Sequence, residues 1–468
     1  MAIEEDLSEW EIAPTGKMFS YGFGYCIVNY FLYYGLAPVF FYYQVVLGLN
    51  VILVGLAFVI FAIWNMVNDP ILGYLTERPT RLTKKLGFRA PWVVMSAIPL
   101  IMLFFLIWTP PLGADQMTIF LWFIIITCLF DTFFSIFNDH VYGGYTNQFP
   151  SEYERRRSFA IATLCIAFGV IGMGALSGLF IDPDVQSSYV LFALIACIIM
   201  GVLCFLLILG IKESKEMKQM YLDSYGKDER DAGFFSTMKT ALKTKNFLVS
   251  LAGYTIQVTA VNLFLASQLY LFTYVYNLGF ENFLYAQLVG VVAVIVMIPF
   301  WSNFARRNGF KKTYWICFTL HGLSFLLYIF VIKSLPLLLV FTFINYALLS
   351  GEILMLQPVA SDTYDEVSVQ VGRHVDATLV GVRTFFFRIA FLVQAGVFVV
   401  VFIATGFVAK TGATQTELAL WGIRFNGLIL PAIMFVVMAL IFRHYYTLEG
   451  AEKEELIKKL KEMNLFQH

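Results

Sequence analysis

Three polar side chains lie close together in an otherwise apolar segment at 51–75. Asn65, Asn68 and Asp69 occupy positions i, i+3 and i+4, so a helix would place them on one face. Two amides and a carboxylate supply oxygens that suit a monovalent cation, and the carboxylate alone can take up a proton. A carboxylate in hydrocarbon costs at least about 2.5–3.5 kcal/mol, so it is usually retained for function. We therefore predict a cation- or proton-coupling site at these residues, with Na⁺ at Asp69 and Asn68 as one form of it.

Other apolar segments also carry charged side chains. Asp131 and Asp139 are eight residues apart in 116–143, which is roughly 80° around a helix axis. Arg388 would lie about 18 Å along a helix from Asp376, near the middle of the membrane. Acids in the first half of the chain and this arginine could attract one another across a central cavity.

Each of these groups also has a structural interpretation. Asp69 can be a gate residue that pairs with basic side chains at the cytoplasmic end of its helix. Asp139 can form a structural salt bridge, and Arg388 can be a cation that only stabilises a helix bundle. Asp131 and Glu352, which interrupt two further apolar segments, can also form structural pairs. The sequence leaves these alternatives open.

The composition is that of an integral membrane protein. Of the 468 residues, 59% are hydrophobic and 14% are charged, and the mean hydropathy is +0.74. Soluble proteins typically contain about 25% charged residues. The net charge of +0 does not indicate a nucleic-acid partner. The 6 cysteines lie in apolar runs without a CxxC or Cys/His cluster, which predicts buried free thiols rather than disulfides or a zinc site.

Apolar runs of about 20 residues, the length that crosses a bilayer, predict twelve transmembrane helices. They fall near 18–47, 51–75, 91–111, 116–143, 158–181, 187–211, 246–277, 283–304, 313–333, 336–360, 376–407 and 418–444. Gly35 and Pro38 are expected to loosen the first helix, and Pro358 the tenth. Most lysines and arginines follow even-numbered helices, so the positive-inside rule places both termini in the cytoplasm. We expect a multi-pass protein of the plasma membrane.

The longest polar insertion separates six predicted helices from six. The turn at 86–89 resembles the one at 308–311, which supports two related halves of the kind that transporters repeat in parallel. We therefore expect five regions along the chain. These are a cytoplasmic N-terminus at 1–17, a six-helix bundle at 18–211, a central cytoplasmic loop at 212–245, a second bundle at 246–445 and an amphipathic cytoplasmic tail at 446–468.

Four groups of motifs together resemble one family of transporters. They are SYGFG at 20–24, W-N-x-x-N-D-P-x-x-G at 64–73 with GFRAPW at 87–92, Tyr142-Gly143 with SEYE at 151–154, and SDTYD at 361–365 with Gly-Arg at 372–373. This set resembles the glycoside–pentoside–hexuronide:cation symporters, the group that contains the melibiose permeases, in the major facilitator superfamily. The resemblance implies an all-α membrane protein with the major facilitator fold and 12 transmembrane helices in two six-helix halves.

The resemblance also implies roles for individual residues. Two acids of sodium-coupled members match Asn65 and Asp69, and a third cation contact matches Asn68. Ile136 takes the place of a threonine ligand, so only part of the family's sodium site is present. Asp139 matches the acid that joins the cation and sugar sites. Proton coupling or uncoupled transport therefore gains support.

The resemblance is weaker at the sugar site. Asn29 stands where the family has a sugar-binding acid, and Gly143 where it has a sugar-stacking tryptophan. Arg388 takes the place of a lysine. These departures argue against a galactoside-like substrate, although nearby aromatic side chains could still stack on a sugar ring.

We predict a monomeric secondary active transporter that moves a sugar or glycoside by alternating access, coupled to H⁺ or Na⁺ and without another cofactor. Substrate contacts are predicted at Asn29, Tyr25, Trp64, Asp139, Tyr142 and Arg388, and gate residues at Glu77, Arg78, Asp362, Asp365 and Arg373. A carrier of lysolipids or other amphiphiles and an uncoupled sugar facilitator remain alternatives. The chain lacks GxxxxGK[ST], HExxH and GxSxG motifs, so we do not expect an enzyme or an ATP-driven pump.

Overall fold

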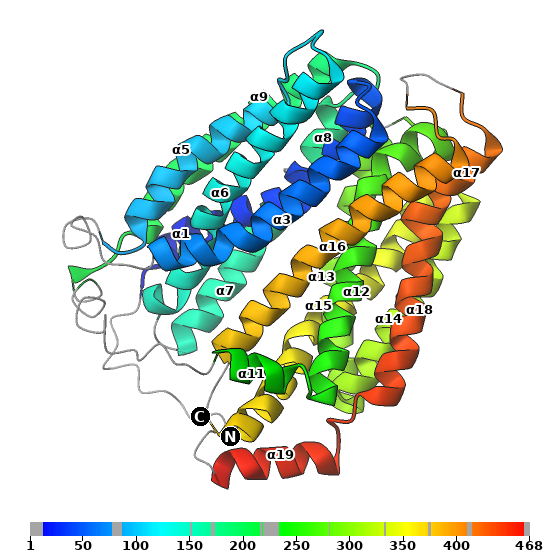
Figure 1. Ribbon diagram of the computed structural model, residues 1–468. Helices are drawn as coiled ribbons and strands as arrows, with labels where there is room; N and C mark the ends of the chain where they lie inside the picture. The colour runs from blue at the N-terminus through cyan, green and yellow to red at the C-terminus, as the bar shows by residue number, and fades with distance from the viewer. Residues whose placement is uncertain are drawn as a thin grey trace. The chain divides into compact units, whose positions relative to one another are not determined.

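The structure is a computed structural model that describes most of the chain. The described residues are 13–76, 87–149, 152–169, 174–215, 218, 234–279, 281–331, 334–372, 376–409 and 414–462. All regular structure within these ranges is helical. The chain divides into two compact units, Met1–Glu229 and Arg230–His468, and long helices make up each of them in Figure 1.

The first unit is a bundle whose long helices pack side by side. Helix α6 packs against α5 and α3, and α1 packs against α7 and α9. The elements are α1 (Thr15–Tyr30), η2 (Phe31–Gly35), α2 (Val39–Phe41), η3 (Tyr42–Val46), α3 (Val51–Thr76), α5 (Ala90–Ile107), α6 (Gln116–Gln148), α7 (Glu152–Ala167), α8 (Gly174–Phe180) and α9 (Gln186–Ile211).

The second unit is a similar bundle with a short surface helix at each end. Helix α15 packs against α13 and α14, α18 packs against α14 and α12, and α16 packs against α12. The elements are α11 (Phe234–Ala241), α12 (Lys245–Tyr270), η5 (Leu271–Tyr276), α13 (Asn282–Asn308), α14 (Phe310–Leu327), η6 (Tyr328–Phe330), α15 (Leu335–Val371), α16 (Asp376–Thr405), α17 (Glu417–Arg424), η7 (Phe425–Ile429), α18 (Leu430–Tyr445) and α19 (Ala451–Glu462).

Many of these helices are long enough to cross a bilayer. In the described part of the chain, 10 of them have both the length and the apolar composition that a membrane span requires. The interrupted passages at 15–46 and 152–180 are consistent with the remaining two of the twelve predicted helices. The chain is therefore a multi-pass, all-α membrane protein, as its composition predicts.

The first helical passage of each unit contains a wide, π-helical turn. In the first unit the helix loosens on both sides of Pro38, which lacks a backbone N–H donor. The turn η3 begins twenty-seven residues after Thr15, and η5 begins twenty-six residues after Lys245. The interruption that Gly35 and Pro38 predict is therefore confirmed, and a similar one recurs at nearly the same distance from the start of α12 in the second unit.

Helix α15 is longer than the sequence predicts. It runs without a break through Pro358 to Val371 and ends where Gly372 adopts a left-handed conformation with φ 82°. A proline removes only one donor from the helix, and here the helix continues beyond it. Asp362 and Asp365 therefore lie on a helix rather than on the loop that was expected after position 360.

The amphipathic tail forms the short helix α19, which packs against the end of α15. Leu456 and Leu460 are buried, and Lys453 Nζ lies 2.7 Å from Oδ2 of Asp362. Glu449 lies just before α19, and its Oε1 is 2.8 Å from Nζ of Lys311. Much of the apolar face of this helix is thus covered by the protein itself.

The GFRAPW motif leads into α5 at a turn that the side chain of Glu213 closes. The Glu213 carboxylate accepts hydrogen bonds from the backbone N–H groups of Phe88 and Arg89, the latter at 3.0 Å. Gly87 has φ 104°, and a side chain there would collide with the same carboxylate. Burial raises the pKa of Glu213, although the two N–H donors and Arg89 act in the opposite direction. This geometry explains why the motif begins with glycine.

Candidate functional site

The two amides of α3 converge on a carboxylate of α6. Nδ2 of Asn65 donates to Oδ1 of Asp131, and Nδ2 of Asn68 donates to Oδ2 of the same residue at 3.4 Å. Asp131 is 2% exposed and Asn68 8% exposed, so this contact lies inside the first unit. Both oxygens of one buried carboxylate are therefore held by amides from the neighbouring helix.

Two further polar side chains extend this contact. Nε1 of Trp64 donates to Oγ1 of Thr132 at 3.2 Å, and Thr132 in turn donates to the carbonyl of Cys128 at 2.9 Å. The Trp64 side chain is 43% exposed, so it borders the site rather than filling it. Trp64, Asn65 and Asn68 thus face the same stretch of α6.

Asp139 lies farther along α6, about 12 Å from Asp131 at 1.5 Å per residue. Its Oδ1 accepts a hydrogen bond from Nδ2 of Asn138 at 3.1 Å, and the side chain is partly buried. The predicted pair of acids is therefore spread along one helix, and only Asp131 lies at the amides.

Several of the predicted site residues, or their side chains, lie outside the described part of the chain. The backbone of Asp69 continues α3, but its side chain is outside the described residues. Glu77, Arg78 and Arg373 also lie outside them. The role of Asp69 and the gate that these three residues would form remain predictions. Asp365 is partly buried on α15.

Two of the aromatic residues predicted to contact substrate, Tyr25 and Tyr142, form a cluster in the first unit. Tyr25 and Tyr142 meet edge to face with ring centroids 4.6 Å apart. Nδ2 of the buried Asn29 donates to the Tyr25 carbonyl at 2.8 Å and to the Tyr142 hydroxyl at 3.1 Å. Tyr142 is 42% exposed, whereas Tyr25 is 3% exposed, so Tyr142 presents the open face of the cluster.

The position of the family's stacking tryptophan is filled in another way. A Cβ atom on Gly143 would collide with the guanidinium of Arg89, so a tryptophan ring cannot stand there without displacing that arginine. The guanidinium of Arg89 therefore lies beside the position where the family has a tryptophan.

The second unit contains a buried polar network. Nδ1 of His321 lies 2.9 Å from Oε1 of Glu352, and Nε2 of Gln257 donates to Oε2 of Glu352 at 3.2 Å. The hydroxyl of Tyr314 donates to Oε1 of Gln257 at 3.3 Å. Glu352 is 0% and His321 1% exposed. Both carboxylate oxygens are satisfied, which fits the structural pairing considered for Glu352.

The two arginines of α16 have different surroundings. Arg388 follows Arg383 by five residues, which is about 140° around the helix. The guanidinium of Arg383 lies over the ring of Tyr254 at 4.1 Å from its centroid, and Arg388 is partly buried on another face. The predicted substrate role therefore belongs to a different side of α16 from the one that carries Arg383.

Sequence reasoning considered Asp131 but assigned the carboxylate of the cation site to Asp69. One signal pointed to Asp131. Asn65 is fourteen residues after the start of α3, and Asp131 is fifteen residues after the start of α6. Two helices that enter the membrane from the same side therefore bring these residues to similar depths.

Within the described residues, no group of three His, Cys, Asp or Glu side chains is arranged to hold a metal ion. A sodium ion at Asp131 would therefore need amide oxygens from Asn65 and Asn68 in addition to the carboxylate. The oxygen and nitrogen of an asparagine amide are exchanged by a half turn, so the same two residues can donate to a bare carboxylate or coordinate a cation.

Comparison with known proteins identifies transporters throughout. The sequence matches the family described as MFS/sugar transport protein over residues 16–449. The sodium-dependent lysophosphatidylcholine symporter 1-B of Danio rerio is 26% identical over 421 residues, which is 82% of this chain and 77% of that protein. The uncharacterized symporter YnaJ of Bacillus subtilis is 24% identical over 433 residues, 90% of this chain and 89% of YnaJ.

Solved structures share the fold at low sequence identity. The nucleoside transporter NupG has a TM-score of 0.60 at 14% identity, covering 93% of this chain and 99% of NupG. The xylose transporter XylE from E. coli, in an inward open conformation, has a TM-score of 0.60 at 11% identity, covering 95% of this chain and 98% of XylE. Both are transporters with the major facilitator fold, so the predicted fold is confirmed.

Proposed function

Because the chain belongs to the MFS/sugar transport protein family, we propose that this secondary transporter couples the movement of a lysophospholipid-like amphiphile to the entry of Na⁺ or H⁺. The observation that carries the coupling is the pair of α3 amides on the Asp131 carboxylate. The chain is a transporter and not an enzyme, and the resemblance to the melibiose-permease group is confirmed at the level of the family.

The amides can keep the carboxylate ready for a cation. Burying a charged carboxylate in a membrane helix costs about 2.5–3.5 kcal/mol on insertion scales. A hydrogen bond to a charged group contributes about 1.5–3 kcal/mol. Two such bonds offset part of that cost, and a cation or proton that neutralises Asp131 would remove the rest. Uptake of the cation would neutralise the charge, and rotation of the Asn65 and Asn68 amides would direct their oxygens at it.

Cation uptake can drive transport only if the cation prefers one conformation. A ligand shifts an equilibrium between two states by no more than its difference in affinity for them. A neutralised Asp131 is easier to enclose in hydrocarbon than an ionised one. The cation-bound transporter would then pass more readily through a closed state, and the binding sites would become exposed alternately to the two sides of the membrane.

An amphiphile is supported over a sugar by two observations. The relative from Danio rerio is named for lysophosphatidylcholine and sodium, and its match extends over most of both chains. In addition, the Arg89 guanidinium lies beside Gly143, where the family has a sugar-stacking tryptophan. A guanidinium suits an anionic or zwitterionic head group better than a neutral sugar ring.

A sugar remains the second candidate because of the aromatic cluster. Tyr142 is partly exposed, and its hydroxyl is oriented by Asn29. An oriented aromatic ring beside an amide can stack on one face of a sugar and donate to its hydroxyls. The family's description as sugar transport proteins favours the same solute class.

Flux measurements with purified protein in sealed vesicles distinguish these functions. Labelled lysophosphatidylcholine, a labelled β-galactoside and a labelled hexuronide would be offered with a Na⁺ gradient, a proton gradient or neither. Vesicles without protein serve as the control for spontaneous movement of lysolipid between leaflets. Albumin extracts the lysolipid that remains in the outer leaflet, so that only lipid that has crossed the membrane is counted. We expect gradient-dependent uptake of the lysolipid alone. Uptake of a sugar instead would select the second candidate, and uptake that ignores both gradients would contradict coupling.

A further inference from the structure

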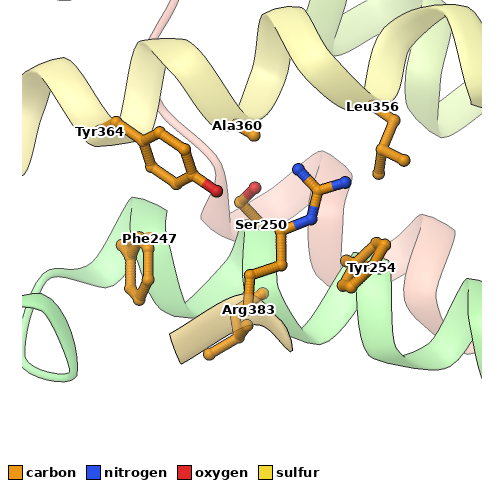
Figure 2. Close-up of a pocket in the computed structure, with 8 residues that line it drawn as sticks. Phe247, Ser250, Tyr254, Leu356, Ala360, Tyr364 and Arg383 are labelled. Atoms are coloured by element: carbon orange, nitrogen blue, oxygen red, sulfur yellow. The ribbon is translucent and has the colours of Figure 1, made fainter. Parts of the chain in front are cut away.

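The second unit contains a small pocket at the contact of α12, α15 and α16. It is lined by Arg383 from α16, Ser250 and Tyr254 from α12, and Tyr364, Ala360 and Leu356 from α15 (Figure 2). The space is about 10 Å³, which is room for about one water molecule. It therefore accepts the oxygens of a terminal group but not a sugar ring.

The polar groups that line the pocket are hydrogen-bond donors. In Figure 2 the guanidinium of Arg383 and the hydroxyls of Ser250 and Tyr364 point toward one another. A guanidinium has five N–H donors and no acceptor, and each hydroxyl can also donate. Among the residues that the structure describes, no carboxylate forms an ion pair with Arg383. The pocket thus offers a positive charge and hydrogen-bond donors to a negatively charged ligand.

Arg383 is held in place by contacts that do not neutralise it. Its guanidinium lies 4.1 Å from the centroid of the Tyr254 ring and donates through Nη1 to Oε1 of Gln357 at 3.4 Å. A ring face and a neutral amide orient the planar fork but leave its charge and several donors available. An arginine that only extends to the membrane surface would not need both contacts.

The base of the pocket is a closely packed apolar cluster. Ala241, Phe247, Leu251, Ala360 and Val382 are buried there together with the Tyr364 ring, and they join α11, α12, α15 and α16. Packing of this kind fixes the positions of the helices that carry the three polar groups. The donors are therefore preorganised, which reduces the cost of binding a charged group.

We propose that this pocket binds an oxyanion, with Arg383 forming paired hydrogen bonds to its oxygens and Ser250 and Tyr364 completing the contacts. Carboxylates and phosphates match the planar fork of an arginine, and the small volume admits only their oxygen edge. The assignment rests on the proposed function in one respect, because it names the phosphate of a lysophospholipid as the natural occupant. Free inorganic phosphate has the same chemistry and is the other source.

Calorimetric titration of the purified full-length protein tests the pocket without any transport. The probes are inorganic phosphate, a short-chain lysophosphatidylcholine below its micelle concentration, and glucose as an uncharged comparison. Arg383→Gln removes the charge and the fork. Arg443→Gln is the matched control, because Arg443 lies over the Trp315 ring at 4.8 Å from its centroid but lines no part of this pocket.

We expect Arg383→Gln to weaken binding of the phosphate-bearing probe at least about tenfold and Arg443→Gln to leave it unchanged. Ser250→Ala and Tyr364→Phe should each weaken it by a smaller factor, and their folding can be checked independently by thermal unfolding. Equal binding by Arg383→Gln and Arg443→Gln would overturn the assignment of the pocket as an oxyanion site. Binding of lysophosphatidylcholine but not phosphate identifies the lipid as the source.

The outcome for the pocket can be separated from the outcome for transport. If the wild-type protein moves no lysolipid, but phosphate binding still depends on Arg383, the oxyanion pocket stands and the proposed solute is wrong. If lysolipid transport occurs, and Arg383→Gln binds and transports as well as Arg443→Gln does, the proposed function stands. The pocket assignment is then wrong.

Discussion

Nδ2 of Asn68 lies 3.4 Å from Oδ2 of Asp131, so an amide of α3 donates to a carboxylate of α6. Asn65 donates to the other oxygen of the same carboxylate. The family resemblance puts the negative charge of the cation site on the helix that supplies these amides. In this chain the neighbouring helix α6 presents a charge to the same amides, at Asp131.

Replacing Asp131 with Asn should abolish accumulation driven by a cation gradient. The variant keeps the size of the side chain but removes the charge that a cation neutralises, so exchange of solute across the vesicle membrane should persist. Accumulation should fall at least about tenfold, which corresponds to 1.4 kcal/mol or more of lost coupling. Uptake and exchange in the same vesicle preparation measure the two quantities.

Asp115→Asn is the matched control for that experiment. Asp115 caps the start of α6 by accepting hydrogen bonds from the backbone N–H groups of Met117 and Thr118, at 2.9 and 3.0 Å. Asparagine caps helices as well as aspartate does, so this carboxylate-to-amide change on the same helix should leave accumulation intact. Equal loss in both variants would remove Asp131 from the coupling site.

Replacing Asn65 with Asp should strengthen the dependence on sodium. The new carboxylate would stand beside Asp131, and two neighbouring negative charges attract a monovalent cation more strongly than one. Half-maximal uptake should then require about tenfold less Na⁺. Uptake measured over a series of Na⁺ concentrations at fixed pH checks this. A variant that responds to pH more strongly and to Na⁺ no better would show that the two acids share a proton instead.

Replacing Glu213 with Ala should destabilise the first unit by about 1–3 kcal/mol. The carboxylate accepts two backbone N–H groups at the turn before α5, and an unsatisfied buried donor costs about that amount. Glu213→Gln retains an acceptor oxygen and should lose less stability. Unfolding midpoints of the purified protein in detergent provide the comparison. Equal losses for Ala and Gln would mean that the charge, not the acceptor, stabilises the turn.

The same residue should make stability depend on pH. Burial raises the pKa of Glu213 above its ordinary value of 4.5, so the folded protein holds the proton more tightly than the unfolded chain. This contribution to stability is fully present below pH 4.5 and is lost as the pH rises to the pKa of the folded state. The difference in unfolding midpoint between the wild type and Glu213→Gln should therefore change over that window and be constant above it.

The His321–Glu352 pair should show strong coupling in a double-mutant cycle. Removing one partner of a buried hydrogen bond leaves the other unsatisfied, which costs about 1–3 kcal/mol. His321→Leu should therefore be more destabilising than the double variant His321→Leu/Glu352→Leu, which removes both polar groups. Thermal unfolding of the wild type, His321→Leu, Glu352→Leu and the double variant measures the coupling. Additive losses would show that the two side chains do not stabilise one another.

Docking of α19 should depend on its apolar side chains more than on its ion pair. A partly exposed salt bridge contributes about 0–1 kcal/mol, so Asp362→Ala should have a small effect. Leu460 is 2% exposed, and a charge at that position would have to be buried or the helix released. Leu460→Asp should therefore speed limited proteolysis near 446–450. The opposite ranking of these two variants would assign docking to the ion pair.

Much of the fold follows from the sequence alone. Apolar runs of membrane-spanning length predict the helices, and the Gly35–Pro38 pair predicts the loosened first passage, because both depend on the residues of one segment. Where contacts with neighbouring segments determine the length of a helix, the prediction is incomplete. The apolar run predicts that this helix ends near 360, but α15 continues to Val371 and is ended by Gly372 in a left-handed conformation.

The candidate site was predictable only in part for the same reason. Spacing placed Asn65 and Asn68 on one face of a helix, and the structure has them there. Which acid they contact depends on the depth and rotation of α6 against α3, and no periodicity within either segment encodes that. The guanidinium of Arg89 beside Gly143 is likewise a contact between segments more than fifty residues apart.

The wide turns η3 and η5 occur at nearly the same distance along the first passage of each unit. A π-helical turn forms its hydrogen bonds from residue i to i+5, and such turns are frequent at functional sites. Each unit therefore has an irregular turn near one end of a long helix. The two turns place the same irregular backbone geometry at corresponding points of the two units.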